Sequence, residues 1–554
     1  MPQQPNESVG NPAKTESSYG TSVATRQTDL SLGVDERVRL MRDGVFNNAS
    51  IVAGGVIGII LVPILLHGLG VESYGIWIVA LSLVGVAGLF DCGLGQAVTR
   101  EVAASLDRES TAESAKFVST ARNAYLLLGA AGGMVIAAAG LPMARGLHLP
   151  YGRNVAAVFL LAGAAFVAER LLTFSTAVLR GLRRFDASNA LMIAMAIWRA
   201  CGIIALLKLG RGLLTVMAWQ ALATAAAAWA GHWALRNLRR EFRFGIGRPD
   251  WSILRAHLSF GLASQLTTVA DVMLWQLVPV IVGFVLGSGW IAPFYIAQRF
   301  PLSLAPVIWS TAEALFPAVS QHQRDDDFTR TREILEVGTR WTVVIALPLC
   351  LVLILMAPEL LQAWVGQHSP DTVVVLRLIT LAVLVEGAAA ASFQTLWGRG
   401  EVRSLVVISG ALSGGSLALS LVLLPRLGVT GAAWGLLLPM LAASAAYTWT
   451  AARHCGTSLL HILDKASEGL LLPLLACLAV CTAVKNLGHP GWTVVITAAS
   501  TAGLAYLICF GYSGARTEEL LFFKNIATVP ASLARSLGSR VRELTGSAGR
   551  RQQG

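Results

Sequence analysis

Hydrophobic residues in this chain gather in long blocks, and short polar stretches separate the blocks. Many blocks reach about 20 residues, the length that an α-helix needs to cross a bilayer. The strands of a membrane β-barrel would instead alternate between apolar and polar positions. We therefore predict an all-α polytopic membrane protein with about fourteen transmembrane helices. The predicted spans are 47–66, 74–91, 117–141, 155–179, 187–208, 213–235, 258–286, 292–316, 341–357, 372–397, 404–424, 431–452, 469–486 and 492–511.

Short sequence matches recur along the chain at a nearly constant spacing. The segment LVPI at 61–64 returns as LVPV at 277–280, 216 positions later. The further matches are Gly181 with Gly398, Leu209-Gly210 with Leu427-Gly428, and TVMAW at 215–219 with TGAAW at 430–434. These matches predict that spans one to six and seven to twelve are duplicated halves. Because six is even, both halves have the same orientation, as in parallel-repeat transporters.

Polar and basic stretches divide the chain into six predicted segments. Residues 1–46 are rich in Ser, Thr, Gln, Asn and Pro and lack an apolar run, so we predict a disordered N-terminus without a signal peptide. The remaining segments are a first six-helix bundle at 47–235, a basic linker at 236–257, a second bundle at 258–452, a helix hairpin at 453–511 and a basic tail at 512–554. The tail is expected to rest on anionic lipid.

Charge is scarce and unevenly distributed. Only 14% of the residues are charged, against about 25% in soluble proteins, while 55% are hydrophobic. The formal net charge is +11, and most Lys and Arg fall in loops on the N-terminal side of the predicted helices. Because basic loops stay in the cytoplasm, both termini are predicted to be cytoplasmic. Topology therefore accounts for the basic charge, and no nucleic-acid partner is expected.

The sequence lacks the features of several enzyme classes. It contains no G-x-x-x-x-G-K-[ST] phosphate loop, so ATP hydrolysis by that route is excluded. Cys477 and Cys481 lie one helical turn apart without further ligands, so no metal site or cofactor is expected. A membrane glycan polymerase or ligase stays an alternative, although the short outer loops offer it little beyond Glu72, His67 and His148. We expect neither catalytic residues nor an enzyme.

Several charged residues fall deep inside predicted spans, although a charge at the bilayer centre costs roughly 2.5–3.5 kcal/mol on insertion scales. The arginines among them are Arg170, Arg199, Arg299 and Arg377. Guanidinium groups bind phosphate oxygens in a bidentate manner. We therefore predict a central cavity between the halves that is lined by arginines and suits an anionic, sugar-bearing substrate. Structural ion pairs between neighbouring helices are the alternative for each residue.

Two carboxylates, two prolines and a tryptophan complete the candidate residues. Asp271 and Glu386 are candidates to bind a proton or Na⁺, although satisfied buried polar groups explain them equally well. Pro63 and Pro279 fall at equivalent depth in spans one and seven. Because proline removes a backbone hydrogen bond and kinks a helix, the pair predicts matched bending points, although Pro is common in membrane helices. Trp275 is deep enough to stack on a sugar.

Five motifs at the ends of predicted helices carry a family resemblance. They are LGVESYGIW at 69–77, FDCGLGQAVTREVA at 90–103, LRGLRRFDASN at 179–189, LWGRGEVRS at 396–404 and PRLGVTGAAWG at 425–435. Together they resemble the polysaccharide biosynthesis/export family of lipid-linked oligosaccharide flippases, the O-antigen and exopolysaccharide exporters. That family belongs to the multidrug/oligosaccharidyl-lipid/polysaccharide superfamily, with the multidrug and toxic compound extrusion (MATE) proteins. The resemblance covers about residues 45–455.

The resemblance implies a MATE-like fold of two six-helix bundles around a cavity, working by alternating access. The implied activity is flipping an undecaprenyl-diphosphate-linked glycan across the bacterial inner membrane for O-antigen or exopolysaccharide synthesis. Proton or Na⁺ antiport, membrane potential or downstream consumption of the glycan would drive it, and the polysaccharide polymerase and chain-length machinery are the implied protein partners. A cation-coupled multidrug exporter of the same fold is the alternative function.

The second motif has a physical interpretation of its own. Gly93 and Gly95 permit a tight chain reversal and close backbone approach. Arg100 follows where a cytoplasmic phosphate would first be met, with a positively charged membrane anchor as the alternative. Many members of the family have twelve spans, and the added hairpin resembles the fourteen-span lipid II flippase branch.

Overall fold

The computed structural model describes residues 34–91, 93–106, 111–147, 153–238, 250, 265, 269–270, 272–313, 328–366, 369–487 and 491–514, and all elements defined there are helices. The first half contains α2 (Val34–Ala87), η1 (Gly88–Asp91), α3 (Leu94–Leu106), α4 (Thr111–Gly146), α5 (Arg153–Gly181), α6 (Phe185–Lys208) and α7 (Leu213–Leu238). The second half contains η2 (Met273–Leu277), α9 (Val278–Leu286), η3 (Ser288–Trp290), α10 (Ile291–Glu313), α12 (Phe328–Leu355), α13 (Ala357–Val365), α14 (Pro370–Gly398), α15 (Val402–Leu427) and α16 (Val429–His454). The last elements are α17 (Leu459–Ser467), α18 (Leu471–Leu487), α19 (Trp492–Cys509) and η5 (Phe510–Gly514).

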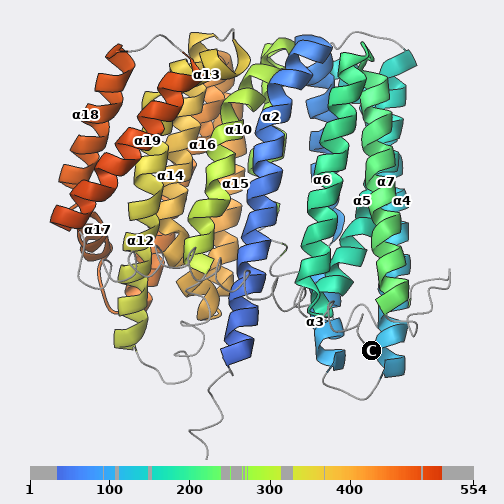
Figure 1. The fold of residues 1–554 in the computed structure, drawn as a ribbon, viewed down its shortest axis with the longest axis horizontal. Coiled ribbons are helices and arrows are strands. Elements are labelled where there is room, and N and C mark those ends of the chain that lie inside the picture. The colour runs from blue at the N-terminus through green and yellow to red at the C-terminus, as the bar shows by residue number, and fades with distance from the viewer. Residues whose placement is uncertain are drawn as a thin grey trace, which may run out of the picture.

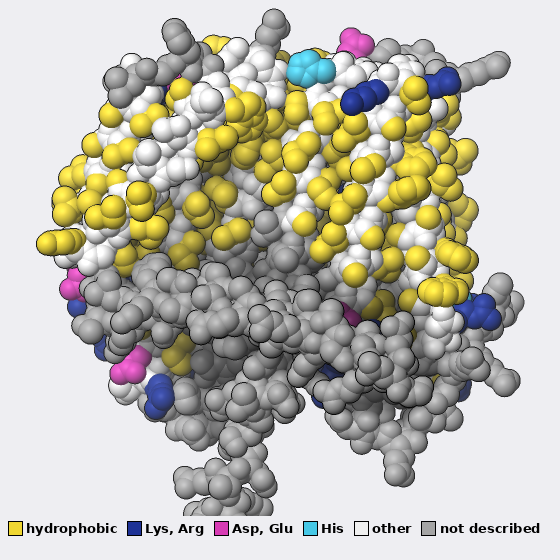
Figure 2. Space-filling view, viewed as in Figure 1, with side chains coloured by type: hydrophobic (Ala, Val, Ile, Leu, Met, Phe, Trp, Pro, Cys, Tyr) yellow, Lys and Arg dark blue, Asp and Glu magenta, His cyan; other side chains and the backbone are white. Residues whose placement is uncertain are grey.

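These helices have the length and composition of membrane spans. Ten of the described helices are long and apolar enough to cross a bilayer, or up to eleven if the bent pair of α17 and α18 is one span. The long helices run side by side, and hydrophobic side chains cover much of the described flank in the same view (Figures 1 and 2). Exposed large side chains include Ile60, Met134 and Leu160, which suits contact with lipid. The predicted all-α polytopic membrane fold is confirmed.

The first helix departs from the predicted boundaries. Predicted spans one and two form one 54-residue helix, α2, whose only non-helical backbone is at Gly70 (φ 77°, ψ 163°). Glycine has no Cβ to clash at this positive φ, so a single residue replaces the predicted loop at 67–73. Residues 34–46, predicted to be disordered, belong to the same helix. Predicted spans seven and eight correspond to Met273–Leu286 and α10, which fall outside the count of ten.

The helices form two lobes with α2 between them (Figure 1). The first lobe contains α3 to α7, and the second contains η2 to α16. Helix α2 contacts α6 of the first lobe on one side and α10 of the second lobe on the other. One hydrophobic cluster runs through both lobes and includes Leu65 of α2, Phe294 of α10 and Leu436 of α16. The two lobes therefore share part of their core along α2.

Backbone turns repeat in the two halves at the spacing of the sequence matches. Helices α5 and α14 both end in a Schellman-type turn, and the left-handed residues of the two turns are Arg183 (φ 57°) and Gly400 (φ 75°), 217 positions apart. Two pairs of glycines with positive φ keep nearly the same spacing, Gly70 with Gly287 and Gly210 with Gly428. This agreement in local conformation supports the duplication that the sequence predicts.

Small residues bring α4 and α5 into backbone contact. A Cβ built on Gly133 would lie 2.8 Å from the carbonyl oxygen of Gly163, and a Cβ on Gly163 would overlap the carbonyl of Gly133 in return. Lipid chains are as apolar as the helix surfaces, so membrane helices associate through close packing of this kind rather than through a hydrophobic drive. The pair therefore sets how closely these two helices approach.

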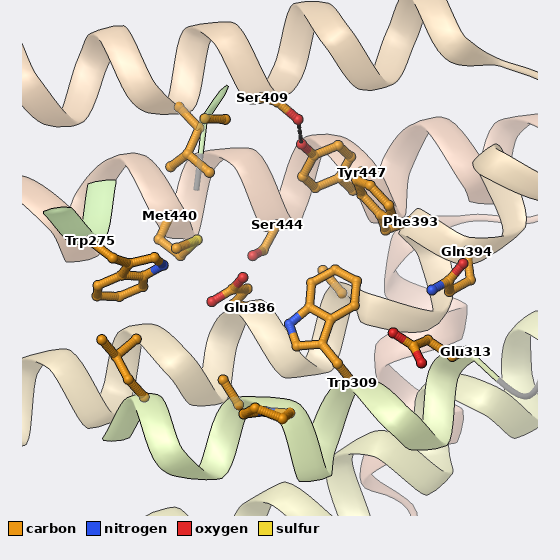
Figure 3. Close-up of a pocket in the computed structure, with 16 residues that line it drawn as sticks. Trp275, Trp309, Glu313, Glu386, Phe393, Gln394, Ser409, Met440, Ser444 and Tyr447 are labelled. Atoms are coloured by element: carbon orange, nitrogen blue, oxygen red, sulfur yellow. Dashed lines mark hydrogen bonds between the residues drawn. The ribbon is translucent and has the colours of Figure 1, made fainter. Parts of the chain in front are cut away.

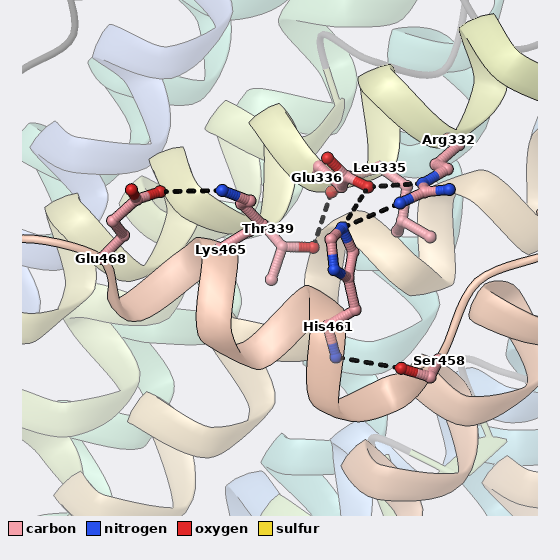
Figure 4. A network of polar contacts seen from close by, with 8 residues as sticks. All are labelled: Arg332, Leu335, Glu336, Thr339, Ser458, His461, Lys465 and Glu468. Carbon is pink, nitrogen blue, oxygen red and sulfur yellow. Dashed lines mark hydrogen bonds and ion pairs between the residues drawn. The ribbon is translucent and has the colours of Figure 1, made fainter.

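The C-terminal hairpin of α18 and α19 packs beside α12, and the short helix α17 leads into it (Figure 1). Arg332 of α12 and His461 of α17 share the carboxylate of Glu336, at 2.7 Å and 3.2 Å (Figure 4). Arg340 donates to the carbonyl of Glu468, which follows α17, at 2.7 Å. The predicted hairpin segment thus contains a third, short helix that is tied to α12 by polar contacts. Most of the predicted linker and tail lies outside the described residues.

Replacing Gly163 with Ala is expected to lower the stability of the protein by about 1–3 kcal/mol, because the new methyl group would overlap the α4 backbone. Gly414→Ala is the matched control, since a Cβ on Gly414, inside α15, would meet no atom within 4 Å. Thermal unfolding of both variants in detergent measures the difference. Equal unfolding temperatures for the two variants would contradict a close α4–α5 contact.

Candidate functional site

Two arginines from opposite lobes approach each other at the interface between the lobes. Arg199 lies on α6 and Arg299 on α10, and the two guanidinium groups are close enough to interact electrostatically. A Cβ on Gly58 of α2 would overlap the Arg299 guanidinium, so this glycine makes room for it beside the central helix. Within the described residues, neither arginine forms a salt bridge. Two neighbouring positive charges that outnumber the carboxylates beside them favour the binding of an anion.

One carboxylate and two tyrosines surround the arginine pair. Glu169 of α5 attracts Arg199, and Tyr295 of α10 interacts electrostatically with the same guanidinium. The ring of Tyr295 meets the ring of Tyr74 edge to face, with centroids 6.3 Å apart. Since Tyr74 follows the break at Gly70, this contact joins α2 to α10 near the end of the molecule where α2 turns. One carboxylate against two guanidinium groups leaves the group positively charged.

A cavity of about 290 Å³ inside the first lobe opens beside Arg199. Its charged lining residues are Glu169 and Arg199, and Gln220 and Thr224 of α7 add hydrogen-bonding groups. Methionines, among them Met217, form part of the remaining wall. The cavity therefore offers polar groups on the first-lobe side of the arginine pair.

Arg170, predicted to line the central cavity, is occupied by partners within the first lobe. Its guanidinium lies 3.6 Å from Glu169 and 3.9 Å from Asp91, and it covers the ring of Phe166 at 4.8 Å. The hydroxyl of Tyr125 donates to Asp91 at 3.1 Å. The structural ion pair that the sequence left open as an alternative therefore describes Arg170 better than a phosphate ligand does.

The same contacts explain the motif at 90–103. Its Asp91 pairs with Arg170, Gly93 has a φ of 75°, and a Cβ on Gly95 would lie 3.1 Å from the Tyr125 hydroxyl. The chain reversal and the close approach expected of these glycines are both present. Arg100, later in the motif, is exposed on α3.

Arg377 lies apart from the arginine pair. Its Nε donates to the carbonyl of Ile354 at 3.0 Å, in the last turn of α12. A helix leaves its final carbonyls without internal partners, so Arg377 satisfies one of them. Of the five arginines predicted to bind substrate, Arg199 and Arg299 are the two that lie together between the lobes.

A larger cavity of about 470 Å³ lies inside the second lobe and has the opposite charge. Glu386 of α14 points into its middle beside Ser444, and Glu313 lies near Gln394 at one side (Figure 3). Its aromatic lining residues are Trp275, Trp309, Phe393 and Tyr447. None of the sixteen described residues that line it is basic. The second lobe therefore encloses an acidic and aromatic space.

The two predicted coupling carboxylates have different outcomes. Glu386 lines the second-lobe cavity, whereas Asp271 lies outside the described residues. Trp275 was predicted to lie deep enough to stack on a sugar, and its side chain lines the same cavity. In the described part of the chain, no three His, Cys, Asp or Glu side chains stand together as a metal site.

An apolar groove of about 430 Å³ lies between the second lobe and the C-terminal hairpin. Helices α10, α12 and α19 form it, with Leu304, Val352 and Leu507 among the lining residues. Phe300, which also lines it, follows Arg299 in the sequence and meets the ring of Trp364 edge to face at 4.6 Å. The groove therefore includes the residue that follows Arg299 on α10.

Both predicted prolines leave a carbonyl that a side chain from another helix satisfies. Pro63 cannot donate to the carbonyl of Ile59, four residues earlier, and the indole N–H of Trp364 donates to that carbonyl at 3.0 Å. Pro279 cannot donate to the carbonyl of Trp275, and the Gln298 amide donates there at 3.4 Å. A π-helical turn, η2, precedes Pro279, whereas α2 remains helical through Pro63. The first of these bonds joins α13 of the second lobe to α2.

Trp364→Phe is expected to destabilise the protein by about 1–3 kcal/mol, because it leaves the partly buried Ile59 carbonyl without a donor. In a Pro63→Ala background the backbone supplies an N–H to that carbonyl, so the same substitution should cost less than half as much. Trp229→Phe, at a lipid-facing position that is 69% exposed, is the control. Thermal unfolding of the four variants completes the double-mutant cycle. Additive effects of Trp364→Phe and Pro63→Ala would contradict the shared carbonyl.

Sequence reasoning missed several residues of the site. Tyr74 and Asp91 lie in motifs that were recognised, but nothing in the sequence distinguished them from their neighbours. Trp364 and Gln298 act on carbonyls of helices elsewhere in the chain, and Trp364 lies 305 positions from Ile59. The only available signal was indirect, because a proline in a membrane helix requires a substitute donor for the carbonyl four residues earlier.

Comparisons with known proteins place the chain in a protein family. Residues 67–394 match the family model described as "Polysaccharide biosynthesis protein". A Shigella flexneri protein described as "Putative O-antigen transporter" is 23% identical over 428 residues, which cover 75% of this chain and 98% of the relative. The match thus extends over almost the whole length of that relative.

Solved structures share the fold at low sequence identity. The lipid II flippase MurJ in an inward closed conformation gives a TM-score of 0.65 at 14% identity and covers 88% of this chain and 100% of its own. An inward-facing multidrug resistance MATE family transporter of the MOP superfamily gives a TM-score of 0.60 at 16% identity, covering 76% of this chain and 96% of its own. The predicted MATE-like fold is therefore confirmed, and the coverage by MurJ exceeds that by the MATE protein.

Proposed function

The chain belongs to the polysaccharide biosynthesis protein family, and from this premise we propose that it is a flippase for a lipid-linked oligosaccharide. The observation that carries the proposal is the pair of Arg199 and Arg299, which opposite lobes contribute at their interface. A diphosphate linkage presents oxygens that guanidinium groups bind in a bidentate manner. We infer an undecaprenyl-diphosphate-linked glycan as the substrate.

The parts of such a substrate fit different surfaces of the molecule. The charged head group would have to lose its hydration in hydrocarbon, and the polar interlobe region replaces that water. The polyprenyl tail can stay in lipid, and the apolar groove between the second lobe and the C-terminal hairpin is the path that we propose for it. The O-antigen transporter named among the relatives supports a glycan destined for a surface polysaccharide.

We further propose the setting in which this flippase works. The chain is a multi-pass membrane protein. Its basic loops support cytoplasmic termini, and we propose the inner membrane of a bacterium as its location. Arg100, exposed on α3 at the cytoplasmic end, is then placed to meet the diphosphate first. A polysaccharide polymerase and chain-length machinery would take up the flipped glycan as protein partners.

Alternating access would move the two lobes relative to each other around the arginine pair. Pro63 and Pro279 are the proposed bending points, because each interrupts the backbone hydrogen bonding of the first helix of its half. Proton or Na⁺ binding at Glu386, with Asp271 as the second candidate, is the proposed source of coupling. No other cofactor is required by this scheme.

Arg199→Ala and Arg299→Ala are each expected to reduce surface polysaccharide by about tenfold or more at unchanged protein level, because each removes a charge-assisted contact to the diphosphate. Arg211→Ala is the matched control, since Arg211 is exposed between α6 and α7. Immunoblotting of surface glycan in a strain that lacks the native gene measures the effect. Normal polysaccharide in both arginine variants would remove the pair from the mechanism.

A cation-coupled drug exporter is the second candidate, and the acidic, aromatic cavity of the second lobe is the observation that favours it. Such an exporter would move organic cations out of loaded vesicles and leave surface polysaccharide unchanged. The interlobe arginines oppose this function because they repel a cation at the face that both lobes share. Efflux of an organic cation together with normal glycan in a deletion strain would reverse our choice.

Replacing both Pro63 and Pro279 with Ala is expected to slow delivery of glycan to the cell surface several-fold, since intact backbone hydrogen bonds stiffen both helices. Pro425→Ala is the matched control, because Pro425 is exposed near the end of α15 and does not belong to the leading helix of either half. The rate at which surface polysaccharide reappears after induction measures the effect. An unchanged rate in the double variant would end the hinge proposal.

A further inference from the structure

We propose that the second-lobe cavity is a sugar subsite that accepts neutral or amino sugars of the lipid-linked glycan and excludes acidic ones. This inference rests on the proposed function and assigns part of the substrate to a space that the arginine pair does not use. The subsite is built on α10, α14 and α16, with Trp275 at one side (Figure 3).

Three aromatic side chains that line the cavity pack against one another. Trp309 meets Phe393 edge to face at 5.4 Å, and Phe393 meets Tyr447 in the same way at 5.6 Å. The Tyr447 hydroxyl is held by Ser409 at 2.6 Å, and Trp275 projects toward the space from the opposite side (Figure 3). Aromatic faces carry negative charge density that attracts the C–H groups on one face of a pyranose ring.

The polar groups of the cavity suit sugar hydroxyls. Glu386, in the middle, and Glu313, at one side, offer carboxylate oxygens that accept hydrogen bonds from hydroxyl or ammonium groups. Gln394 adds an amide that both donates and accepts, and Ser444 adds a hydroxyl. A few polar groups on a mostly apolar wall is the usual composition of a ligand pocket. A cavity of about 470 Å³ has room for more than a water molecule or an ion.

The charge of the cavity selects against acidic sugars. Two carboxylates line it, and none of its described lining residues is basic. A uronic acid would bring a third negative charge into a space of low dielectric, where like charges repel strongly. Neutral sugars avoid this repulsion, and an amino sugar gains an attraction.

The geometry of α10 connects this cavity to the arginine pair. Arg299 lies in the first half of α10, whereas Trp309 and Glu313 line the cavity from its second half. At 1.5 Å per residue, Trp309 lies about 15 Å further along the axis than Arg299. A diphosphate on the arginine pair can therefore direct the attached sugars along α10 into the cavity. Because Glu386 is also the proposed coupling carboxylate, sugar and cation would compete for it.

The test measures binding of soluble trisaccharides to the full-length protein in lipid nanodiscs by saturation-transfer difference NMR. Chitotriose is the neutral probe and trigalacturonate the acidic probe. We expect chitotriose to bind the wild-type protein and trigalacturonate to bind at least about tenfold more weakly. Trp309→Ala should abolish the chitotriose signal. Glu386→Gln should strengthen trigalacturonate binding and so bring the affinities of the two probes closer together.

Two control variants carry the same chemical changes outside the cavity. Trp229→Ala removes an indole that is 69% exposed on α7, and Glu72→Gln neutralises an exposed carboxylate close to Gly70. Neither should alter binding of either probe. Trp309→Phe keeps an aromatic ring, so partial chitotriose binding by this variant would show that Trp309→Ala acts through the ring rather than through misfolding.

Three results would overturn the proposal. They are no binding of chitotriose to the wild-type protein, equal binding of the two probes, and binding of tetraphenylphosphonium that Glu386→Gln abolishes while chitotriose stays silent. The last result would make the cavity a cation site. The surface-polysaccharide assay of Arg199→Ala and Arg299→Ala is independent, so failure of the sugar subsite is distinguished from failure of the flippase function.

Discussion

Every backbone N–H and C=O group inside a bilayer must find a partner within the protein, because hydrocarbon offers none. This constraint makes the described elements of the chain helical, and it decides where a helix can be interrupted. Gly70 and Gly287 turn the chain at matching positions of the two halves. Pro63 and Pro279 interrupt helices within the spans, and there Trp364 and Gln298 donate to the carbonyls that the prolines leave. At both prolines, the carbonyl that lost its backbone donor is therefore paired with a side chain from another helix.

Much of the fold could be predicted because hydrophobic length is a local property of the sequence. The apolar blocks located the spans, and the spacing of LVPI and LVPV anticipated turns such as Arg183 and Gly400 that agree in backbone conformation. The short turn at Gly70 was missed because hydropathy averaged over many residues cannot show that a single glycine is enough to turn the chain. The helix at 34–46 was missed because its polar composition gives no apolar signal.

The site was predicted less completely, because the direction of a side chain depends on its neighbours in space. Arg199 and Arg299 were chosen for depth alone, and they meet because α6 and α10 both flank α2. By the same criterion Arg170 and Arg377 looked equivalent, yet one pairs with Asp91 and the other donates to Ile354. The division of charge between a basic interlobe face and an acidic second-lobe cavity could not be read from spacing, since each set comes from several distant helices.

Under the proposed alternating access, the bond from Trp364 to Ile59 would make separation of the lobes depend on the entry of water. It joins α13 to α2, toward the end of the molecule that we propose faces out of the cell. If the lobes part there, the Ile59 carbonyl loses its donor, and the only replacement is a water molecule that enters the gap. If the lobes separated without water entering, the Ile59 carbonyl would have no hydrogen-bond donor in apolar surroundings. The lobes would therefore rarely separate at this end without water. A bulky, hydrated head group brings its own water, so it would lower the barrier to the opening through which it is released.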